Sequence, residues 1–215
     1  MTETIDVFWS FRSPYSYLAT PDMLALARDY DVAVNLRVVL PLAVRDRAGY
    51  LARDPKWVRY IVLDWQRRAE FLGLPHVWPD PDPVAMDEKG GIAQQQPLIH
   101  WLSHLGVEAQ RRGRGPEFAR EVSGLIFGGT QNWHQGIYLA QAAARAGLHL
   151  EGMWDEIEDG DHEAEIEANQ AALAKAGHWG VPTFVFRGEP FFGQDRVEML
   201  RWTLDQHGIA NRPFE

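Results

Sequence analysis

The chain has no cysteine among its 215 residues. This absence excludes disulfide bonds, thiolate metal ligands and any nucleophilic thiol that belongs to the protein itself. Disulfide exchange by the protein is excluded as well, because that reaction needs a protein sulfur. If the protein takes part in thiol chemistry, the sulfur must therefore come from a ligand.

The sequence also lacks an excess of positive charge. It carries 21 lysine and arginine residues against 30 aspartate and glutamate residues, a formal net charge of −9 at pH 7. Nucleic acid is therefore not expected as a partner, since phosphate backbones are bound by basic surfaces. A small anionic ligand in a local basic pocket is compatible with this charge.

Long apolar runs are missing too. No stretch approaches the roughly 20 apolar residues that cross a bilayer. The first residues, Met1 to Thr4, are polar and acidic, and the apolar run after them is too short for a secretory segment. We therefore expect no membrane partner and a cytoplasmic location.

Strand patterns occur only near the two ends of the chain. Residues 5–11 and 32–40 are rich in β-branched and aromatic side chains, and each predicts a strand. The segment between them has helical periodicity over residues 14–30, with Pro21 expected to kink the helix. A strand, helix and strand of this length form a βαβ unit, whose two strands are parallel.

The other end of the chain predicts a ββα unit. Residues 183–186 and 190–192 are short apolar runs on either side of Arg187-Gly188-Glu189, which is typical of a hairpin. A closing helix is expected over residues 196–207, with Asp195 as its N-cap.

The long middle of the chain is helical in pattern. A loop over residues 75–83 holds four prolines in nine residues. Helices are expected over residues 55–73, 92–105, 116–127, 137–146 and 162–176. The whole order predicts an α/β protein with a thioredoxin-like fold: residues 1–45 and 161–215 would form the thioredoxin-like domain, and residues 46–160 an all-helical domain inserted between its halves.

Three short motifs occur in order along the chain: Phe11-Arg12-Ser13-Pro14-Tyr15-Ser16-Tyr17-Leu18-Ala19, then Gly180-Val181-Pro182-Thr183-Phe184-Val185, then Phe191-Phe192-Gly193-Gln194-Asp195-Arg196. Together they resemble the signatures of the kappa-class glutathione transferases and the 2-hydroxychromene-2-carboxylate isomerases, which belong to the DsbA-like thioredoxin superfamily. This resemblance implies a cytoplasmic, glutathione-dependent enzyme that acts on an aromatic or conjugated electrophile. It also implies a homodimer.

Ser13 is the candidate catalytic residue. It stands where the first strand turns into a helix, and Ser-Pro is typical of an N-cap followed by proline at the first helical position. A serine hydroxyl can donate a hydrogen bond to a thiolate while its lone pairs cap the helix. The resemblance implies that Ser13 activates the glutathione sulfur, with Pro14 and Tyr15 beside it in the binding site. A cap without chemistry is the alternative.

The second and third motifs supply candidate binding residues. The resemblance implies a cis peptide between Val181 and Pro182, so that the exposed backbone pairs with the cysteinyl part of glutathione. The alternative is a proline that only opens a strand at the border of the sheet. Gln194 and Asp195 would hold the γ-glutamyl end, although a helix cap alone also accounts for Asp195.

The sequence departs from the transferases between Pro41 and Lys56. Those proteins usually carry a Ser-Gly-Asn stretch, a Pro-Pro pair and a lysine for the glycyl end of glutathione. This chain has Arg45-Asp46-Arg47-Ala48-Gly49 instead, and its asparagine has no counterpart. Lys56 or Arg59 could replace the lysine. Two alternatives to a glutathione enzyme therefore stay open: an enzyme that uses another low-molecular-weight thiol, and a cysteine-free binding module that grips an extended peptide.

No metal site is expected. His100 and His104 have the four-residue spacing of a two-histidine metal face, but the segment lacks the glutamate of the metalloprotease motif. A solvated helix face is the interpretation that we adopt for them.

The chain is rich in tryptophan, with nine in all. Aromatic side chains at helical spacing usually belong to the core. A second, apolar pocket for an aromatic substrate is the alternative, and its candidate lining residues are Trp9, Trp57, Trp65 and Trp133.

Overall fold

A mixed sheet forms the centre of the computed structural model, which describes residues 2–135 and 137–211. Its four strands have the order β2-β1-β3-β4. Strand β1 pairs in parallel with β2 and antiparallel with β3, and β3 pairs antiparallel with β4. The strands are β1 Glu3–Trp9, β2 Val32–Val38, β3 Thr183–Phe186 and β4 Glu189–Phe192. The predicted βαβ unit and C-terminal hairpin are confirmed.

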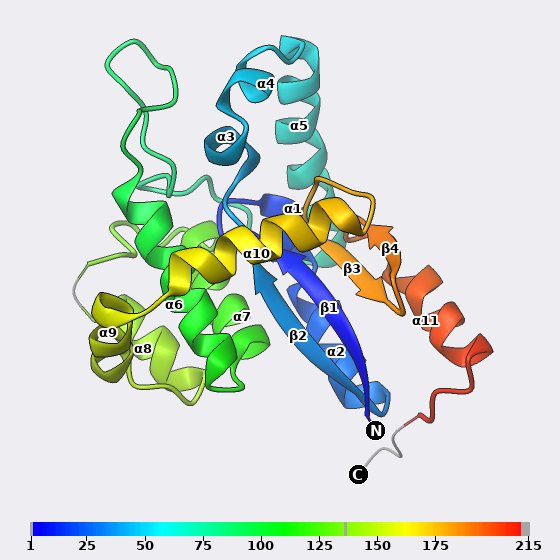
Figure 1. The fold of residues 1–215 in the computed structure, drawn as a ribbon. Helices are drawn as coiled ribbons and strands as arrows, with labels where there is room; N and C mark the ends of the chain where they lie inside the picture. The colour runs from blue at the N-terminus through cyan, green and yellow to red at the C-terminus, as the bar shows by residue number, and fades with distance from the viewer. Residues whose placement is uncertain (1, 136, 212–215) are drawn as a thin grey trace.

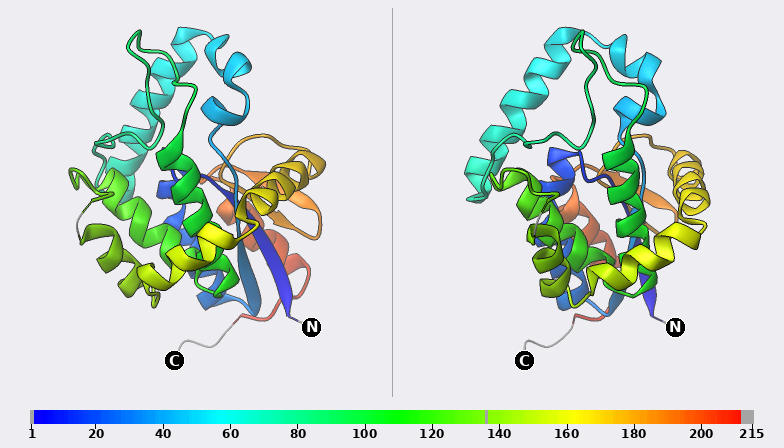
Figure 2. Two further views of the ribbon diagram at one scale, coloured as in Figure 1. Left: turned by 60° about the vertical axis from the view of Figure 1, so that its left-hand side comes forward. Right: turned by 90° about the vertical axis from the view of Figure 1, so that its left-hand side faces the viewer.

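Helices surround this sheet on both faces. Helix α10 lies across one face, and α2 and α11 lie against the other (Figures 1 and 2). Helices α6 to α9 gather at one side of the sheet, whereas α3 to α5 project beyond its end (Figure 1). The bounds are α1 Pro14–Leu18, α2 Thr20–Asp29, α3 Leu42–Arg45, α4 Arg47–Leu51, α5 Pro55–Leu72, α6 Pro97–Arg111, α7 Gly115–Phe127, α8 Tyr138–Arg145, α9 Leu150–Asp159, α10 His162–Lys175 and α11 Val197–Gln206.

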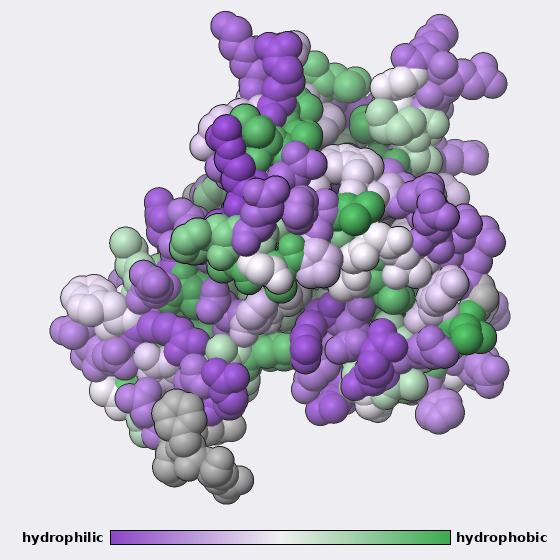
Figure 3. Space-filling model, turned by 180° about the vertical axis from the view of Figure 1, so that it is seen from behind, coloured by the Kyte–Doolittle hydropathy of each residue, from purple (hydrophilic) through white to green (hydrophobic). Residues whose placement is uncertain are grey.

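One continuous apolar core joins the sheet to the helical segment. Ile5, Val7 and Trp9 of β1 are fully buried, and so are Leu102 and Leu105 of α6. None of the helices in the described part of the chain combines the length and the apolar character that a membrane crossing needs. Seen from behind, the apolar side chains at the surface lie in separate patches among hydrophilic ones (Figure 3).

Side-chain amides hydrogen-bond the outer side of β2 and the residues just beyond it. They come from α6 and α10, the helices that pack beside this strand. The pairs are Gln110 with the N–H of Leu36 at 2.9 Å, Asn169 with the carbonyl of Val38 at 3.1 Å and Gln170 with the N–H of Leu40 at 3.2 Å.

The expected helix over residues 14–30 is two helices. Helix α1 ends at Leu18 and α2 begins at Thr20, whose hydroxyl donates to the carbonyl of Tyr17 at 2.7 Å. Pro21 occupies the second position of α2, where its missing N–H disturbs no helical hydrogen bond. The proline therefore starts a helix and does not kink one.

The expected helix over residues 92–105 is shifted toward the C-terminus. Ala93 still belongs to a loop, because its N–H donates to the carbonyl of Ala85 at 2.9 Å. The side chain of Gln96 then bonds both of these residues, and α6 begins at Pro97. Helices α3, α4 and α9 had no counterpart in the sequence pattern, and the first two of them are only four and five residues long.

The predicted cap of the last helix is wrong. Helix α11 begins at Val197, and its N-cap residue is Arg196, with no side-chain hydrogen bond to the first turn. The carboxylate of Asp195 turns outward and pairs with the guanidinium of Arg196 at 2.6 Å. The carboxylate of Asp195 thus forms an ion pair with the neighbouring Arg196 and does not cap α11.

Candidate active site

Ser13 meets the loop before β3 at one end of the sheet. Its Oγ accepts a hydrogen bond from the N–H of Ser16 at 3.2 Å, so Ser13 is the N-cap of α1 as predicted. The same Oγ lies 3.4 Å from the carbonyl oxygen of Val181. The peptide bond between Val181 and Pro182 is cis, as the resemblance implies. Two motifs 168 residues apart therefore form one site.

The hydroxyl proton of Ser13 is only weakly engaged. Hydrogen bonds between two oxygens are usually about 2.5–3.0 Å long, and the contact to Val181 is longer. A sulfur placed near Ser13 could take this hydrogen bond without disturbing the cap. Helix α1 has only five residues, so its dipole adds little to the stabilisation of an anion there.

An ion pair fixes the residue before Ser13. The guanidinium of Arg12 donates to both carboxylate oxygens of Asp82, at 3.2 and 2.9 Å, and lies over the ring of Trp78. The hydroxyl of Tyr17 also donates to the carbonyl of Pro75, at 2.9 Å. The proline-rich loop, residues 75–83, therefore contacts both ends of residues 12–17, which we call the Ser13 turn.

Tyr15 is held by a carboxylate on α5. Its hydroxyl donates to Asp64 at 2.6 Å, and Tyr60 donates to the other oxygen of the same carboxylate at 3.2 Å. Burial and the hydrogen bond to Asp64 raise the pKa of Tyr15, to which the negative charge of Asp195 also contributes. Tyr15 is thus neutral at physiological pH, with its one phenol proton donated to Asp64.

Gln194 is buried beside the same helix. Its side-chain oxygen accepts a hydrogen bond from the Nε of Arg68 at 2.9 Å. Helix α5 therefore contacts both the first motif, through Asp64, and the third motif, through Arg68.

A third arginine lies between two indole rings. The guanidinium of Arg53 is 4.3 Å from the ring centre of Trp57 and 4.7 Å from that of Trp179, two residues before Val181. Its buried Nε has no hydrogen-bond partner in the described part of the chain. Arg45 donates to the carbonyls of Leu40 and Trp179, which ties the segment after β2 to the same loop. No carboxylate of the described residues forms an ion pair with Arg53, so its positive charge can attract an anionic ligand.

The remaining candidate residues take different positions. Pro14 is buried at the first position of α1. Lys56 and Arg59 are exposed on α5, and neither side chain has a hydrogen bond or ion pair with another described residue. Their role in binding stays a prediction.

The four-tryptophan pocket is not formed. Trp9, Trp65 and Trp133 are fully buried in the core, as aromatic side chains at helical spacing usually are. Of the four, only Trp57 reaches the surface, with 36% of its area exposed. Three exposed aromatic side chains lie near the loop that holds the cis Val181–Pro182 peptide, which we call the cis-proline loop: Trp57, Trp179 and Phe192. The ring of Phe192 stacks on His178 at 4.0 Å.

Sequence reasoning missed the residues that α5 and its approach contribute, namely Arg53, Asp64 and Arg68. The helix itself was predicted, but no motif connects it to the site. One signal was available: arginines at positions 45, 47, 53, 59, 67 and 68 give this segment a local excess of positive charge in an acidic chain. That local excess is typical of a region that meets an anion.

Known proteins resemble this chain over most of its length. A family model described as a DSBA-like thioredoxin domain matches residues 4–205. The 2-hydroxychromene-2-carboxylate isomerase of Pseudomonas putida is 25% identical over an alignment 207 positions long with gaps, which covers 91% of each chain. Human glutathione S-transferase kappa 1 is 21% identical over an alignment 226 positions long with gaps, which covers 99% of this chain and 96% of that protein.

The fold is also found among solved structures. A structure of 2-hydroxychromene-2-carboxylate isomerase superposes with a TM-score of 0.72 at 19% sequence identity. The match covers 95% of this chain and 96% of the other. This likeness establishes the fold of the chain.

Proposed function

The chain belongs to the family of DSBA-like thioredoxin domains, and from this premise we propose that it is a glutathione-dependent, cytoplasmic enzyme. It acts as an isomerase or a transferase on an aromatic or conjugated electrophile. Relatives named an isomerase and a glutathione transferase support an enzymatic role. The observation that carries the proposal is the position of Ser13 Oγ against the carbonyl of Val181, at a cis peptide.

The residues of the site suit the parts of glutathione. Ser13 would donate its proton to the sulfur, and the backbone of Val181 would pair with the cysteinyl unit. Gln194 and Asp195 would hold the γ-glutamyl end, where the first turn of α11 has no side-chain cap and can bind a carboxylate. Bound in this way, glutathione supplies a thiolate nucleophile.

The protein itself would position the sulfur and the electrophile and would remove water from around them. Ser13 would stabilise negative charge on a sulfur, and the hydrogen bond from Tyr15 to Asp64 would hold the segment after Ser13 against α5. Trp57, Trp179 and Phe192 expose apolar surface next to the cis-proline loop, where a flat aromatic acceptor could stack. These groups would bring the electrophile to the sulfur and exclude water from both.

Glutathione binding and turnover test the proposal. We expect saturable binding of glutathione by calorimetry, an increase in thiolate absorbance at neutral pH, and turnover of 2-hydroxychromene-2-carboxylate or of an electron-poor aryl chloride. Binding and turnover with a different low-molecular-weight thiol would identify a different thiol enzyme. Absence of binding for every thiol would instead favour a peptide-binding module and contradict the proposal.

We assign the glycyl carboxylate of glutathione to Arg53, beside Trp179, and substitution of Arg53 tests this assignment. Arg53→Met should weaken the binding of glutathione about tenfold, because a charge-assisted hydrogen bond to a partly buried group contributes about 1.5 kcal/mol or more. Binding of γ-glutamylcysteine, which lacks the glycyl carboxylate, should not change. Calorimetric titration of both ligands measures the difference.

Two neighbouring cations provide the controls. Lys56→Met and Arg59→Met remove equal charge from the exposed face of α5. If either variant loses glutathione selectively over γ-glutamylcysteine while Arg53→Met does not, the carboxylate belongs to that residue and the assignment to Arg53 is wrong.

A second copy of the chain is the partner that the proposal includes. Helix α5 exposes several further large apolar side chains that a homodimer could cover: Val58, Tyr60, Leu63, Phe71 and Leu72. Sedimentation at micromolar concentration should give twice the mass of one chain, and Phe71→Glu should shift the protein toward the monomer. A wild-type mass of one chain across the concentration range would contradict the dimer.

A further inference from the structure

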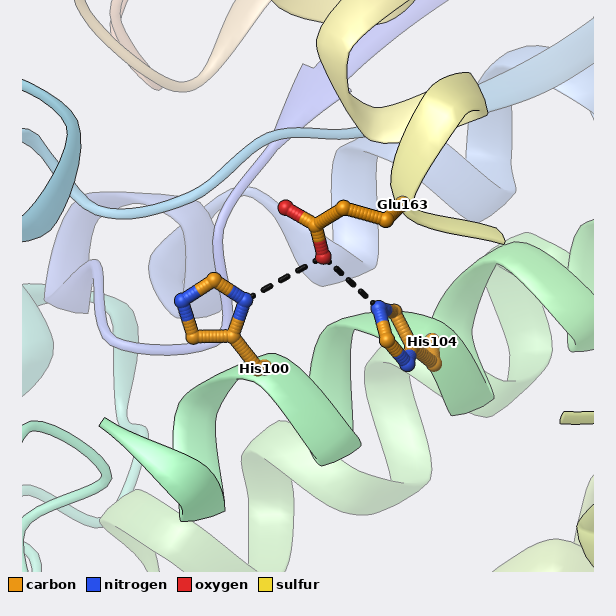
Figure 4. Close-up of side chains that lie close together, drawn as sticks. All are labelled: His100, His104 and Glu163. Atoms are coloured by element: carbon orange, nitrogen blue, oxygen red, sulfur yellow. Dashed lines mark hydrogen bonds and ion pairs between the residues drawn. The ribbon is translucent and has the colours of Figure 1, made fainter. Parts of the chain in front are cut away.

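A carboxylate lies over the two histidines that share one face of α6. His100 and His104 are one turn apart, and Glu163 reaches them from the first turn of α10 (Figure 4). One oxygen of Glu163 is 3.2 Å from Nδ1 of His100 and 2.9 Å from Nε2 of His104. All three atoms lie within 4.8 Å of one another. The two histidines therefore do not form the solvated helix face that the sequence suggested.

The spacing of these atoms suits a bound ion. A tetrahedral Zn²⁺ with bonds of about 2.0–2.1 Å places its ligand atoms about 3.3 Å apart. The observed oxygen–nitrogen distances require only a small outward movement of the side chains. Two imidazoles and one carboxylate are also a donor set that zinc and similar divalent transition ions prefer.

The charges around His100, His104 and Glu163 also favour a bound cation. Glu163 makes no ion pair with a lysine or arginine of the described chain, and its partners there are the two imidazoles. The neighbouring acidic groups do have cations: Glu165 and Asp161 pair with Arg111.

The site is accessible to solvent. The side chains of His100, His104 and Glu163 are 36%, 22% and 45% exposed. Three protein ligands would leave one position of a tetrahedral ion for solvent. Beneath the site, the ring of buried His162 lies 6.0 Å from that of His104 and bonds Glu108 at 3.0 Å, which limits the movement of the cluster.

We propose that His100, His104 and Glu163 bind one divalent transition ion, with Zn²⁺ as the expected species. The ion joins α6 to the start of α10, the helix that leads from the helical segment back to the sheet. It lies apart from the Ser13 turn in sequence and uses none of the residues assigned to glutathione.

Zinc titration of the full chain tests this site. The protein is freed of any polyhistidine tag, stripped with a chelator and titrated with ZnCl₂ in the absence of glutathione, whose thiol would compete for the ion. We expect one ion per chain with micromolar affinity or better. A hundredfold excess of zinc over the dissociation constant should raise the melting temperature by about 5 °C or more.

Three variants locate the ion. His104→Ala and Glu163→Gln should each weaken zinc binding at least a hundredfold and remove the thermal shift, while His149→Ala, at the exposed N-cap of α9, should change neither. Cobalt should give visible absorption bands in the wild type and lose them in the first two variants. Circular dichroism shows whether each variant is folded, and His100→Ala replaces any that is not.

Two results would overturn the proposal. One is zinc affinity weaker than millimolar in the wild type, which would leave the cluster as two imidazole–carboxylate hydrogen bonds. The other is binding that His104→Ala and Glu163→Gln leave unchanged, which would assign the ion to another place. Neither result bears on glutathione binding, which is measured separately on the metal-free protein.

Discussion

Ser13→Ala should lower turnover with glutathione about a hundredfold and abolish the thiolate absorbance of the bound ligand at neutral pH. A hydrogen bond to a charged group contributes about 1.5–3 kcal/mol, and loss of a comparable oxyanion donor costs about 100-fold to 1,000-fold in rate. The hydroxyl of Ser13 is available for this bond because its contact with Val181 is long. Steady-state kinetics and absorbance titration measure both effects.

The same serine is a helix cap, so stability must be separated from chemistry. Loss of the cap alone should lower the free energy of unfolding by about 1 kcal/mol. Ser13→Asp keeps a capping oxygen but repels a thiolate, and it should be folded and inactive. Ser16→Ala removes a buried hydroxyl without a hydrogen-bond partner in the described chain, and activity should persist. Full activity in Ser13→Asp would refute the assigned role.

Glu108→Ala should lower the free energy of unfolding by about 3 kcal/mol, since it leaves Arg112 without its carboxylate and the buried side chain of His162 without its hydrogen-bond partner. The carboxylate of Glu108 pairs with Arg112 at 2.6 Å and with His162 at 3.0 Å, and both Glu108 and His162 are almost fully buried. For a chain of this length the melting temperature should fall by about 10 °C. Thermal and urea unfolding at neutral pH measure the loss.

An exposed ion pair serves as the matched control. Glu121 pairs with Arg145, which is 51% exposed, and Glu121→Ala should cost less than about 1 kcal/mol. Equal losses in the two variants would mean that burial does not strengthen the Glu108 pair.

Acid should remove the stabilisation that Glu108 provides. Burial raises the pKa of this carboxyl, but the hydrogen bonds from Arg112 and His162 outweigh burial and hold it below its usual value. The contribution is therefore present above the unfolded-state pKa of about 4.3 and is lost as the pH falls through the lower folded-state pKa. The difference in stability between the wild type and Glu108→Ala should shrink below about pH 4.

The parts of the fold that local chemistry dictates could be predicted from the sequence. Alternation and β-branched residues define the strands, and Ser13-Pro14 defines the start of a helix. The helices that were displaced or missed depend on contacts made elsewhere. For example, α6 begins only at Pro97, because the side chain of Gln96 makes two hydrogen bonds with Ala85, in a loop that no local sequence pattern predicts.

Some residues of the candidate site could likewise be predicted from the sequence, and others could not. Ser13, Val181 and Pro182 are recognisable because they lie in short motifs, and the structure brings them together. Arg53, Asp64 and Arg68 lie on or beside a helix far from both motifs, so only the tertiary arrangement reveals them. Glu163 is similar, since 59 residues separate it from His104.

The three amides that bond β2 restrict how copies of this chain can associate. A border strand with free backbone groups is a template for strand addition, and Gln110, Asn169 and Gln170 occupy such groups here. At the opposite border, β4 contains Pro190, which has no N–H to donate. The sheet is thus poorly suited to recruit a foreign strand at either border.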